Sequence, residues 1–363
     1  MKKKIAFLIP LCVLLAAAVW AFAAGDAGDP LASLSYLNGT FSTLVDSRVD
    51  ERLDASDKAL LEGVENGGIL TADSATAWTE VRLKQADVLS GVTGTNVMLL
   101  AGSMQVTYAS GAVVDTTTGT VAASGSVLSA RHRYIVAEDT SAAFTVTSKT
   151  AVADYQGSFS FTYSGAVDYN AMASALKALH LFKGSFTGYG EGFDLEVAPT
   201  RLQALIMFIR VLGEEEQALA WTGTTPFTDI TKGSDAEKYV GYAYSKGYTN
   251  GYSATQFKPA GAVNAYQYTE FVLRAMGYSS AANTNLADTF VRTQEAGVLT
   301  AGEVSMLQAD QFLRAELVYI SYYALDAVLP GEGRTLGDLL CEKGVFTSWE
   351  RETAAAMVTG WRL

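Results

Sequence analysis

The chain has 363 residues, a formal net charge of −12 and only two cysteines. An acidic surface repels phosphate backbones, which argues against nucleic-acid binding and against non-specific adhesion to anionic polymers. Binding to such a polymer would therefore have to use a few placed cations. Length alone predicts two or three domains.

Residues 1–23 are typical of a secretory signal peptide. A basic Met1-Lys2-Lys3-Lys4 start is followed by an apolar run from Ile5 to Trp20 and by the small-x-small site Ala21-Phe22-Ala23. The alternative is an uncleaved membrane anchor, which the shortness of the apolar run disfavours. We expect an exported protein with no transmembrane segment after cleavage. Only Cys341 then remains, so stability must come from the core rather than from a disulfide.

Residues 29–66 have the spacing of an amphipathic helix. Apolar side chains recur at three- and four-residue steps, charged residues fill the opposite face, and Asn66-Gly67-Gly68 ends the region. We expect a helical lead-in that docks on its own domain or pairs with another copy of the chain. Its apolar positions are Leu34, Leu37, Phe41, Leu44, Val45, Val49 and Leu53.

Residues 78–165 predict a small all-β sandwich or barrel. Short alternations of apolar and polar residues occur at 104–108, 144–147 and 159–163, separated by glycine-bearing turns.

From residue 168 the pattern becomes helical, and it contains an internal repeat. Two copies carry an aromatic residue, a helix-start residue, an arginine and a glycine at the same offsets, and a third, weaker copy keeps Gly297 and Arg314-Ala315-Glu316. Such self-similarity indicates one supersecondary unit used several times. The equally spaced residues are Phe193, Thr200, Arg210 and Gly213 in the first copy and Phe257, Asn264, Arg274 and Gly277 in the second.

These copies resemble the S-layer homology (SLH) module. The family pattern runs from Phe-x-Asp-(Val/Ile) through a helix to a glycine-bounded turn, then Phe-x-Pro and Thr-Arg-Ala-Glu. The second copy is the most complete, and the first has His180 where the family usually has glycine. The second copy's matching segments are Phe227-Thr228-Asp229-Ile230, Gly247-Tyr248-Thr249-Asn250-Gly251 and Phe257-Lys258-Pro259.

The resemblance covers residues 168–330, with repeats at about 168–213, 226–278 and 284–328. It implies a mostly α-helical, pseudo-threefold domain that binds secondary cell-wall polysaccharide in grooves between repeats. Residues 331–363 are expected to form a C-terminal helical cap that packs on the last repeat. The whole chain is then a multidomain α+β protein: signal peptide, amphipathic helix, small all-β domain and repeat domain.

The resemblance also implies a non-enzymatic surface protein of a Gram-positive, Firmicutes-like bacterium. It would be secreted to the cell wall and held there non-covalently, with the β domain as a displayed or binding module. An alternative left open by the sequence is a self-assembling, S-layer-like homo-oligomer in which the repeats are mainly architectural.

Candidate polysaccharide contacts follow from the same motifs. The arginine of Thr-Arg-Ala-Glu, a main anion contact in the family, corresponds to Arg201 and Arg314, whereas the second copy has Ala265. The alternative for each arginine is a solvated helix-end charge or a salt bridge to a neighbouring repeat, and Arg210 and Arg274 are expected to be structural. The remaining candidates are Thr200 and Gln203, which also form a capping box, Gly251, which would let a sugar approach the backbone, and Tyr248 and Tyr252, which would stack on sugar faces.

No catalytic, metal or cofactor site is predicted. His132 and His180 lie in different regions, and one mature cysteine provides neither a zinc site nor a Cys-His pair. Glu214-Glu215-Glu216 is expected to be a solvated helix end. A third hypothesis, an enzyme with the β domain as catalytic module, has no catalytic constellation to support it.

Overall fold

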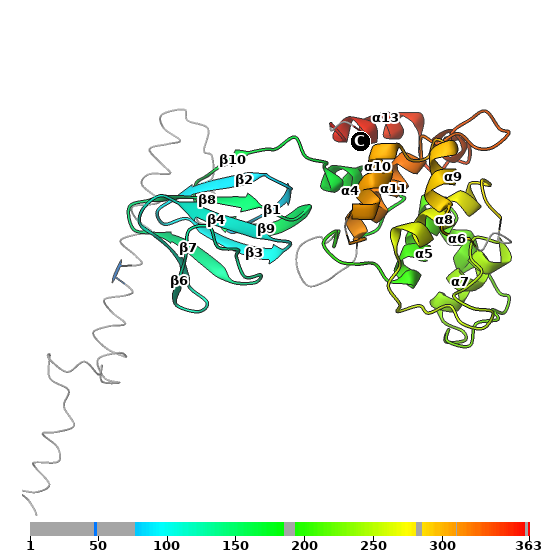
Figure 1. Ribbon diagram of the computed structural model, residues 1–363, viewed down its shortest axis with the longest axis horizontal. Coiled ribbons are helices and arrows are strands. Elements are labelled where there is room, and N and C mark those ends of the chain that lie inside the picture. The colour runs from blue at the N-terminus through cyan, green and yellow to red at the C-terminus, as the bar shows by residue number, and fades with distance from the viewer. Residues whose placement is uncertain (1–46, 49–76, 185–192, 281–284, 310, 360–361) are drawn as a thin grey trace, which may run out of the picture. The chain divides into compact units, whose positions relative to one another are not determined.

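The computed structural model describes residues 47–48, 77–184, 193–280, 285–309, 311–359 and 362–363 (Figure 1). The chain divides into two compact units, residues 1–73 and residues 74–363. In the first unit only Ser47 and Arg48 are described, and both are helical. The predicted signal peptide, 1–23, and nearly all of the predicted helical lead-in, 29–66, lie outside the described residues.

Residues 79–162 form two antiparallel sheets, so of the two predicted all-β folds, sandwich or barrel, the structure has the sandwich (Figure 1). The six-stranded sheet has the order β1-β9-β3-β7-β5-β6, and the four-stranded sheet has the order β10-β2-β8-β4. The strands are β1 (Thr79–Lys84), β2 (Val88–Val92), β3 (Asn96–Ala101), β4 (Met104–Tyr108), β5 (Ala112–Asp115), β6 (Thr120–Ala122), β7 (Arg133–Ala137), β8 (Ser141–Val146), β9 (Thr150–Gln156) and β10 (Phe159–Thr162).

The sandwich core is built from alternate strand residues, as the two-residue period of a strand requires. Val97 and Leu99 of β3 are buried, whereas Met98 between them is partly exposed. Phe144 of β8 and Leu89 of β2 lie in the same hydrophobic cluster as the two β3 residues. The inward faces of the two sheets therefore share one core.

Helices follow the sandwich in the described residues beyond 168, as predicted (Figure 1). They are α4 (Tyr169–Ala178), α5 (Arg201–Val211), α6 (Glu215–Leu219), α7 (Asp235–Ser245), α8 (Ala265–Ala275), α9 (Thr289–Glu295), α10 (Ala301–Ala309), α11 (Arg314–Ala324), α12 (Leu336–Glu342) and α13 (Ser348–Met357).

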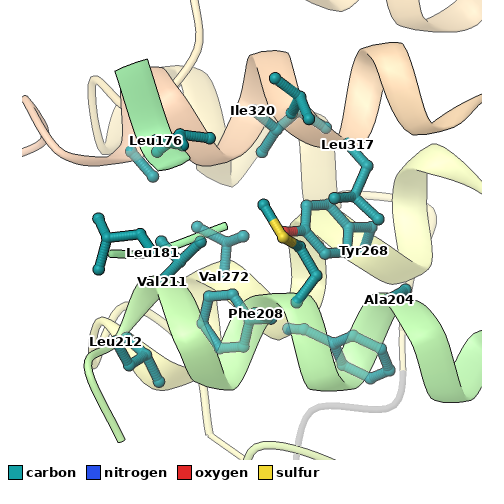
Figure 2. Packing of buried hydrophobic residues seen from close by; sticks show 14 of the residues in the cluster. Leu176, Leu181, Ala204, Phe208, Val211, Leu212, Tyr268, Val272, Leu317 and Ile320 are labelled. Atoms are coloured by element: carbon teal, nitrogen blue, oxygen red, sulfur yellow. The ribbon is translucent and has the colours of Figure 1, made fainter. Parts of the chain in front are cut away.

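Helices α5, α8 and α11, one from each predicted repeat, pack on one another (Figure 2). Phe208 of α5 meets Tyr268 of α8 edge to face, with ring centroids 6.3 Å apart. The buried Tyr268 hydroxyl forms a hydrogen bond of 2.6 Å with the Ser321 hydroxyl of α11. Leu317 and Ile320 of α11 lie in the same cluster. Tyr268 of α8 therefore contacts both other helices, and its buried hydroxyl has a hydrogen-bond partner.

Helices α5 and α8 also begin in the same way. The Thr200 hydroxyl accepts from the Gln203 backbone N–H at 3.3 Å, and the Gln203 side chain accepts from the Thr200 N–H at 3.0 Å, which confirms the predicted capping box. Asn264 and Gln267 repeat this arrangement at α8. Arg201, Ala265 and Arg314 are each the first residue of their helix.

The C-terminal helices contact more than the last repeat. The backbone N–H groups of Leu336 and Gly337 in α12 donate to carbonyls of Ala327 and Leu325, just after α11, as expected. Helix α13, however, packs against α4, the first helix of the first repeat. The C-terminal segment therefore contacts the first repeat as well as the last.

His180 has a backbone conformation that favours glycine. Its φ is +62°, close to the φ of +75° at Gly247 and +69° at Gly297, which follow α7 and α9 at the corresponding places. The backbone thus keeps the left-handed turn even though the side chain departs from the family pattern.

Candidate functional site

A cavity of about 440 Å³ lies between the start of α5, the loop that follows α7 and helix α8. We call it the Arg201 cavity, because Arg201 is the lining residue contributed by α5 and its side chain is only 7% exposed. The predicted contacts Gly251 and Tyr252 also line it. The full set is Arg201, Asn250, Gly251, Tyr252, Ser253, Ala254, Gln267, Glu270, Phe271, Arg274 and Leu286.

The direct contacts of the Arg201 guanidinium are with neutral groups. Its Nη2 donates to the carbonyl oxygen of Gly251 at 3.1 Å, and its Cζ lies 5.1 Å and 5.2 Å from the ring centroids of Phe257 and Phe271. Its Nε is buried and has no hydrogen-bond partner. Arg201 is therefore neither a solvated helix-end charge nor one half of a salt bridge within the described residues, which were the two alternatives for it.

Burial lowers the pKa of Arg201 to about 10, and the positive charge of Arg274 contributes to the shift. The guanidinium still carries its proton at neutral pH. A buried cation without a counterion is unfavourable, and an anion that enters the cavity would supply the missing negative charge.

Gly251 holds the carbonyl that Arg201 contacts. Its φ is +80°, and an added Cβ would lie 2.3 Å from a ring atom of Phe227, so the position requires glycine. Tyr252 beside it is 59% exposed, and the Lys258 ammonium lies 3.5 Å from the centroid of its ring. An exposed ring at the cavity can stack on the apolar face of a sugar.

Arg274 and Glu270 are functional candidates that the motif comparison did not identify. Glu270 is 2% exposed and accepts from Arg274 at 3.1 Å and from Arg292 at 2.7 Å. Two arginines pair with this one carboxylate. The charge of Arg201 is therefore not balanced by Glu270, and the cavity has an excess of positive charge. Arg210 and Arg274 occupy the same position in the first two repeats, which set them apart in the sequence. That spacing did not indicate that Arg274 lines a cavity.

A comparison with protein-family models matches residues 226–264 to the S-layer homology domain. The match lies within the second predicted repeat and includes the loop that lines the Arg201 cavity. The chain is an SLH domain-containing protein.

Domains of this family generally mediate attachment to the cell wall and place a protein at the cell surface. No curated protein matches the chain. In the part of the chain that the structure describes, no helix has the length and apolar character needed to cross a membrane. No cluster of three or more His, Cys, Asp or Glu side chains among those same residues is placed to hold a metal ion.

Three predicted contacts of the SLH domain lie outside the Arg201 cavity. Thr200 and Gln203 cap α5, and Gln203 lines a different cavity. The Tyr248 hydroxyl donates to Glu214 at 2.9 Å, and its ring meets Phe208 edge to face. Burial, together with the charge of Glu214, raises the pKa of Tyr248. The structure thus brings together Arg201, Gly251 and Tyr252 and leaves these three in packing and capping positions.

Arg314 of the third repeat lines a smaller cavity of about 160 Å³, which it shares with Lys183, Gln203 and Arg210. Its Nη1 lies 4.0 Å from the buried carboxylate of Asp194. Arg314 therefore differs from Arg201, because a carboxylate lies at the edge of ion-pair distance.

The second repeat has a third cavity, of about 330 Å³, at the start of α8. Ala265 takes the place of the arginine, and no charged side chain belongs to the lining, which consists of Asn264, Ala265, Tyr266, Leu307, Gln308 and Phe312. This cavity offers amides, a phenol and apolar groups but no cation.

The expectation that Glu214 and Glu215 form a solvated helix end is wrong. Glu214 accepts from the hydroxyls of Tyr242 at 3.0 Å and Tyr248 at 2.9 Å. Glu215 accepts from Arg210, Tyr239 and Lys183 at 2.6 to 2.8 Å. The two carboxylates thus join the first repeat to α7 of the second, which fixes the junction where the Arg201 cavity lies.

Proposed function

We propose that this protein attaches non-covalently to an acidic secondary cell-wall polysaccharide, and that the Arg201 cavity binds a carboxylate of that polymer. It acts as an anchor and not as an enzyme. A signal peptide over residues 1–23 exports it, and cleavage releases a chain that the helical repeats retain at the wall.

A single observation carries this proposal: a buried guanidinium faces a 440 Å³ cavity without a carboxylate partner. Arg201 can offer its remaining terminal N–H groups to a carboxylate, and a charge-assisted contact of this kind contributes roughly 1.5–3 kcal/mol. Asn250 and Gln267 supply amides for sugar hydroxyls, and Tyr252 supplies an exposed ring.

The three repeats are proposed to form a pseudo-threefold assembly with one cavity at each junction. Two junctions share a backbone contact: the Arg201 N–H donates to Gly261 of the next repeat, and the Arg314 N–H donates to Val197 of the first. The three cavities begin at the first residues of α5, α8 and α11. Only the first is lined by a buried arginine that makes no ion pair with a carboxylate in the described residues, so it would contribute most of the affinity.

A non-enzymatic role fits the chemistry of the Arg201 cavity. Its one carboxylate, Glu270, is held by Arg274 and Arg292 and is poorly suited to act as a general base. Binding without reaction is what the remaining lining groups support.

Co-sedimentation with purified wall sacculi tests the proposal. We expect the mature chain to pellet with the sacculi, and Arg201→Ala to weaken binding by at least about tenfold, the loss of one charged contact. Arg334→Ala is the matched control, because Arg334 pairs with Glu332 and Glu342 on the surface. Equal binding by wild type and Arg201→Ala, or a wild type that stays in solution, would overturn the proposal.

A second candidate function is a self-assembling, S-layer-like protein whose repeats are mainly architectural. Two observations favour this function: Ala265 stands where the motif has an arginine, and Arg314 lies close to Asp194. Sedimentation of the mature chain at increasing concentration separates the two, since a protein that remains monomeric would exclude assembly.

A further inference from the structure

The six-stranded sheet of the sandwich carries an arginine on its outer face. Arg133 of β7 lies opposite Met98 of β3, and Ile135 lies opposite Asn96. The neighbours of these residues that face the sandwich core, Tyr134 and Val97, are buried. Arg133 and Asn96 therefore both lie on the side of the sheet that faces away from the core.

Two neighbours fix the Arg133 side chain. Its Nε and Nη2 donate to Oδ1 of Asn96 at 3.1 Å and 3.0 Å, and its Cζ lies 5.2 Å from the centroid of the Trp78 ring. Asn96 is only 6% exposed, and its amide donates to Gly94 at 3.2 Å and to Gln156 at 3.3 Å. Because the acceptor cannot rotate away, the guanidinium is held in one orientation before any ligand arrives.

No carboxylate compensates the charge of Arg133 in the described parts of the chain, since both of its hydrogen bonds go to an amide oxygen. Arg201 has partners of the same kind, a neutral oxygen as acceptor and aromatic rings against the guanidinium. Arg82 on β1 of the same sheet is different, because it pairs with Glu80 at 3.1 Å. An arginine fixed by neutral groups keeps its charge available, whereas a carboxylate-paired one does not.

The surroundings on this face match a sugar polymer better than a small ion. Trp78 is 36% exposed beside the guanidinium, and Arg133 is itself exposed. Asp154 of β9 lies opposite Met98 of β3 on one side and opposite Glu80 of β1 on the other. It makes no ion pair with Arg133. An aromatic ring next to a fixed arginine can stack on one sugar while the arginine holds the charged group of its neighbour.

We propose that the Arg133 surface, made of Trp78, Asn96 and Arg133, is a second binding site, and that it takes an anionic group of a glycopolymer. The Nη1 amino group and the second N–H of Nη2 face the ligand and bind a carboxylate or a phosphate, and the Trp78 ring stacks on the adjoining sugar. The β domain thus contacts charged polymer independently of the helical repeats.

The test uses the mature chain, residues 24–363, with Arg201→Ala included so that the Arg201 cavity does not contribute. Binding is measured by biolayer interferometry to three immobilised polymers: polygalacturonic acid for carboxylate, poly(glycerol phosphate) for phosphate and dextran as the neutral polymer. Arg133→Gln, which keeps a polar side chain over Asn96, is compared with Arg82→Gln, the carboxylate-paired control. Thermal unfolding checks that both variants fold.

We expect binding to at least one anionic polymer, a loss of about tenfold with Arg133→Gln, and a change of less than about twofold with Arg82→Gln. The polymer that binds identifies the anionic group. No binding to either anionic polymer, equal binding to dextran, or no effect of Arg133→Gln overturns the inference. The wall-anchoring proposal fails on different variants, those of Arg201, so the two failures are distinguishable.

Discussion

Arg201 donates a hydrogen bond of 3.1 Å to the carbonyl oxygen of Gly251, a residue fifty positions further along the chain. This contact joins the first helical position of one repeat to the glycine turn of the next. It places a buried cation at the wall of a cavity and leaves the cation without a carboxylate. The geometry of the turn and the charge of the cavity are therefore linked.

Replacing Gly251 by alanine should both destabilise the fold and close the Arg201 cavity. The left-handed φ would cost about 1 kcal/mol, and the clash with Phe227 and Ser253 should add roughly another 1–3 kcal/mol, the usual cost of overpacking. Urea unfolding measures the sum. Gly233→Ala is the control, because Gly233 has a φ of +76° and no atom within 4 Å of an added Cβ. If the two variants lose equal stability, the close approach of Phe227 to the turn is unimportant.

Glu215 should contribute stability that disappears in acid. Burial alone would raise its pKa, but hydrogen bonds from Lys183, Tyr239 and Arg210 outweigh burial and lower the pKa to about 2 from its usual 4.5. A carboxylate with a lowered pKa stabilises the fold above its usual pKa and loses that contribution as the pH falls through the folded-state value.

The variant Glu215→Gln should therefore melt several degrees below wild type at pH 7 and approach it near pH 2. Melting curves over this pH range check the prediction, with Glu216→Gln as the exposed neighbouring control. A difference between Glu215→Gln and wild type that is constant with pH would contradict it.

His180→Gly should stabilise the protein by about 0.5–1 kcal/mol, because glycine adopts the φ of +62° without strain. His180→Ala keeps the unfavourable φ and removes the imidazole, which lies 3.8 Å from the Glu350 carboxylate. Chemical unfolding should therefore show a gain for glycine and none for alanine. A loss of stability with glycine would mean that the imidazole contact matters more than the backbone.

Arg362 should be essential for the stability of the helical region. The Glu303 carboxylate is completely buried and accepts from Arg362 at 2.6 Å and 3.0 Å and from the Tyr319 hydroxyl at 3.0 Å. Removing the arginine leaves a buried charge without its counterion, which typically costs about 3–5 kcal/mol.

Unfolding of Arg362→Met, compared with the double variant Glu303→Gln/Arg362→Met, measures this dependence. The double variant should recover part of the loss, because a neutral amide is easier to bury than an unpaired carboxylate. Equal stability of wild type and Arg362→Met would contradict the prediction.

Local sequence signals were sufficient for the parts of the fold that depend on neighbouring residues. Alternation in segments such as 144–147 predicted the strands, and the Thr200–Gln203 spacing predicted the capping box. A glycine-bounded turn was expected at residues 247–251, and Gly251 there has a φ of +80°. Each of these features follows from interactions within a few residues of chain.

Features that depend on tertiary packing could not be predicted. Nothing in the spacing of Glu214 and Glu215 indicated that Tyr242, Tyr248 and Arg210 would surround them, because those contacts form only when the repeats pack. The same holds for the packing of α13 on α4. It also holds for Arg133, whose partners Asn96 and Trp78 come from distant positions in the chain.

The most direct test of wall attachment changes both Arg201 and the carboxylates of the polysaccharide that it is proposed to bind. Calorimetric titration should compare wild type and Arg201→Ala with purified wall polysaccharide, used once with its carboxylates intact and once with them reduced to alcohols. If Arg201 binds a carboxylate, Arg201→Ala and reduction should each weaken binding by at least about tenfold, and together by little more than either alone. Independent, additive losses, or full affinity of Arg201→Ala for the intact polymer, would contradict the account.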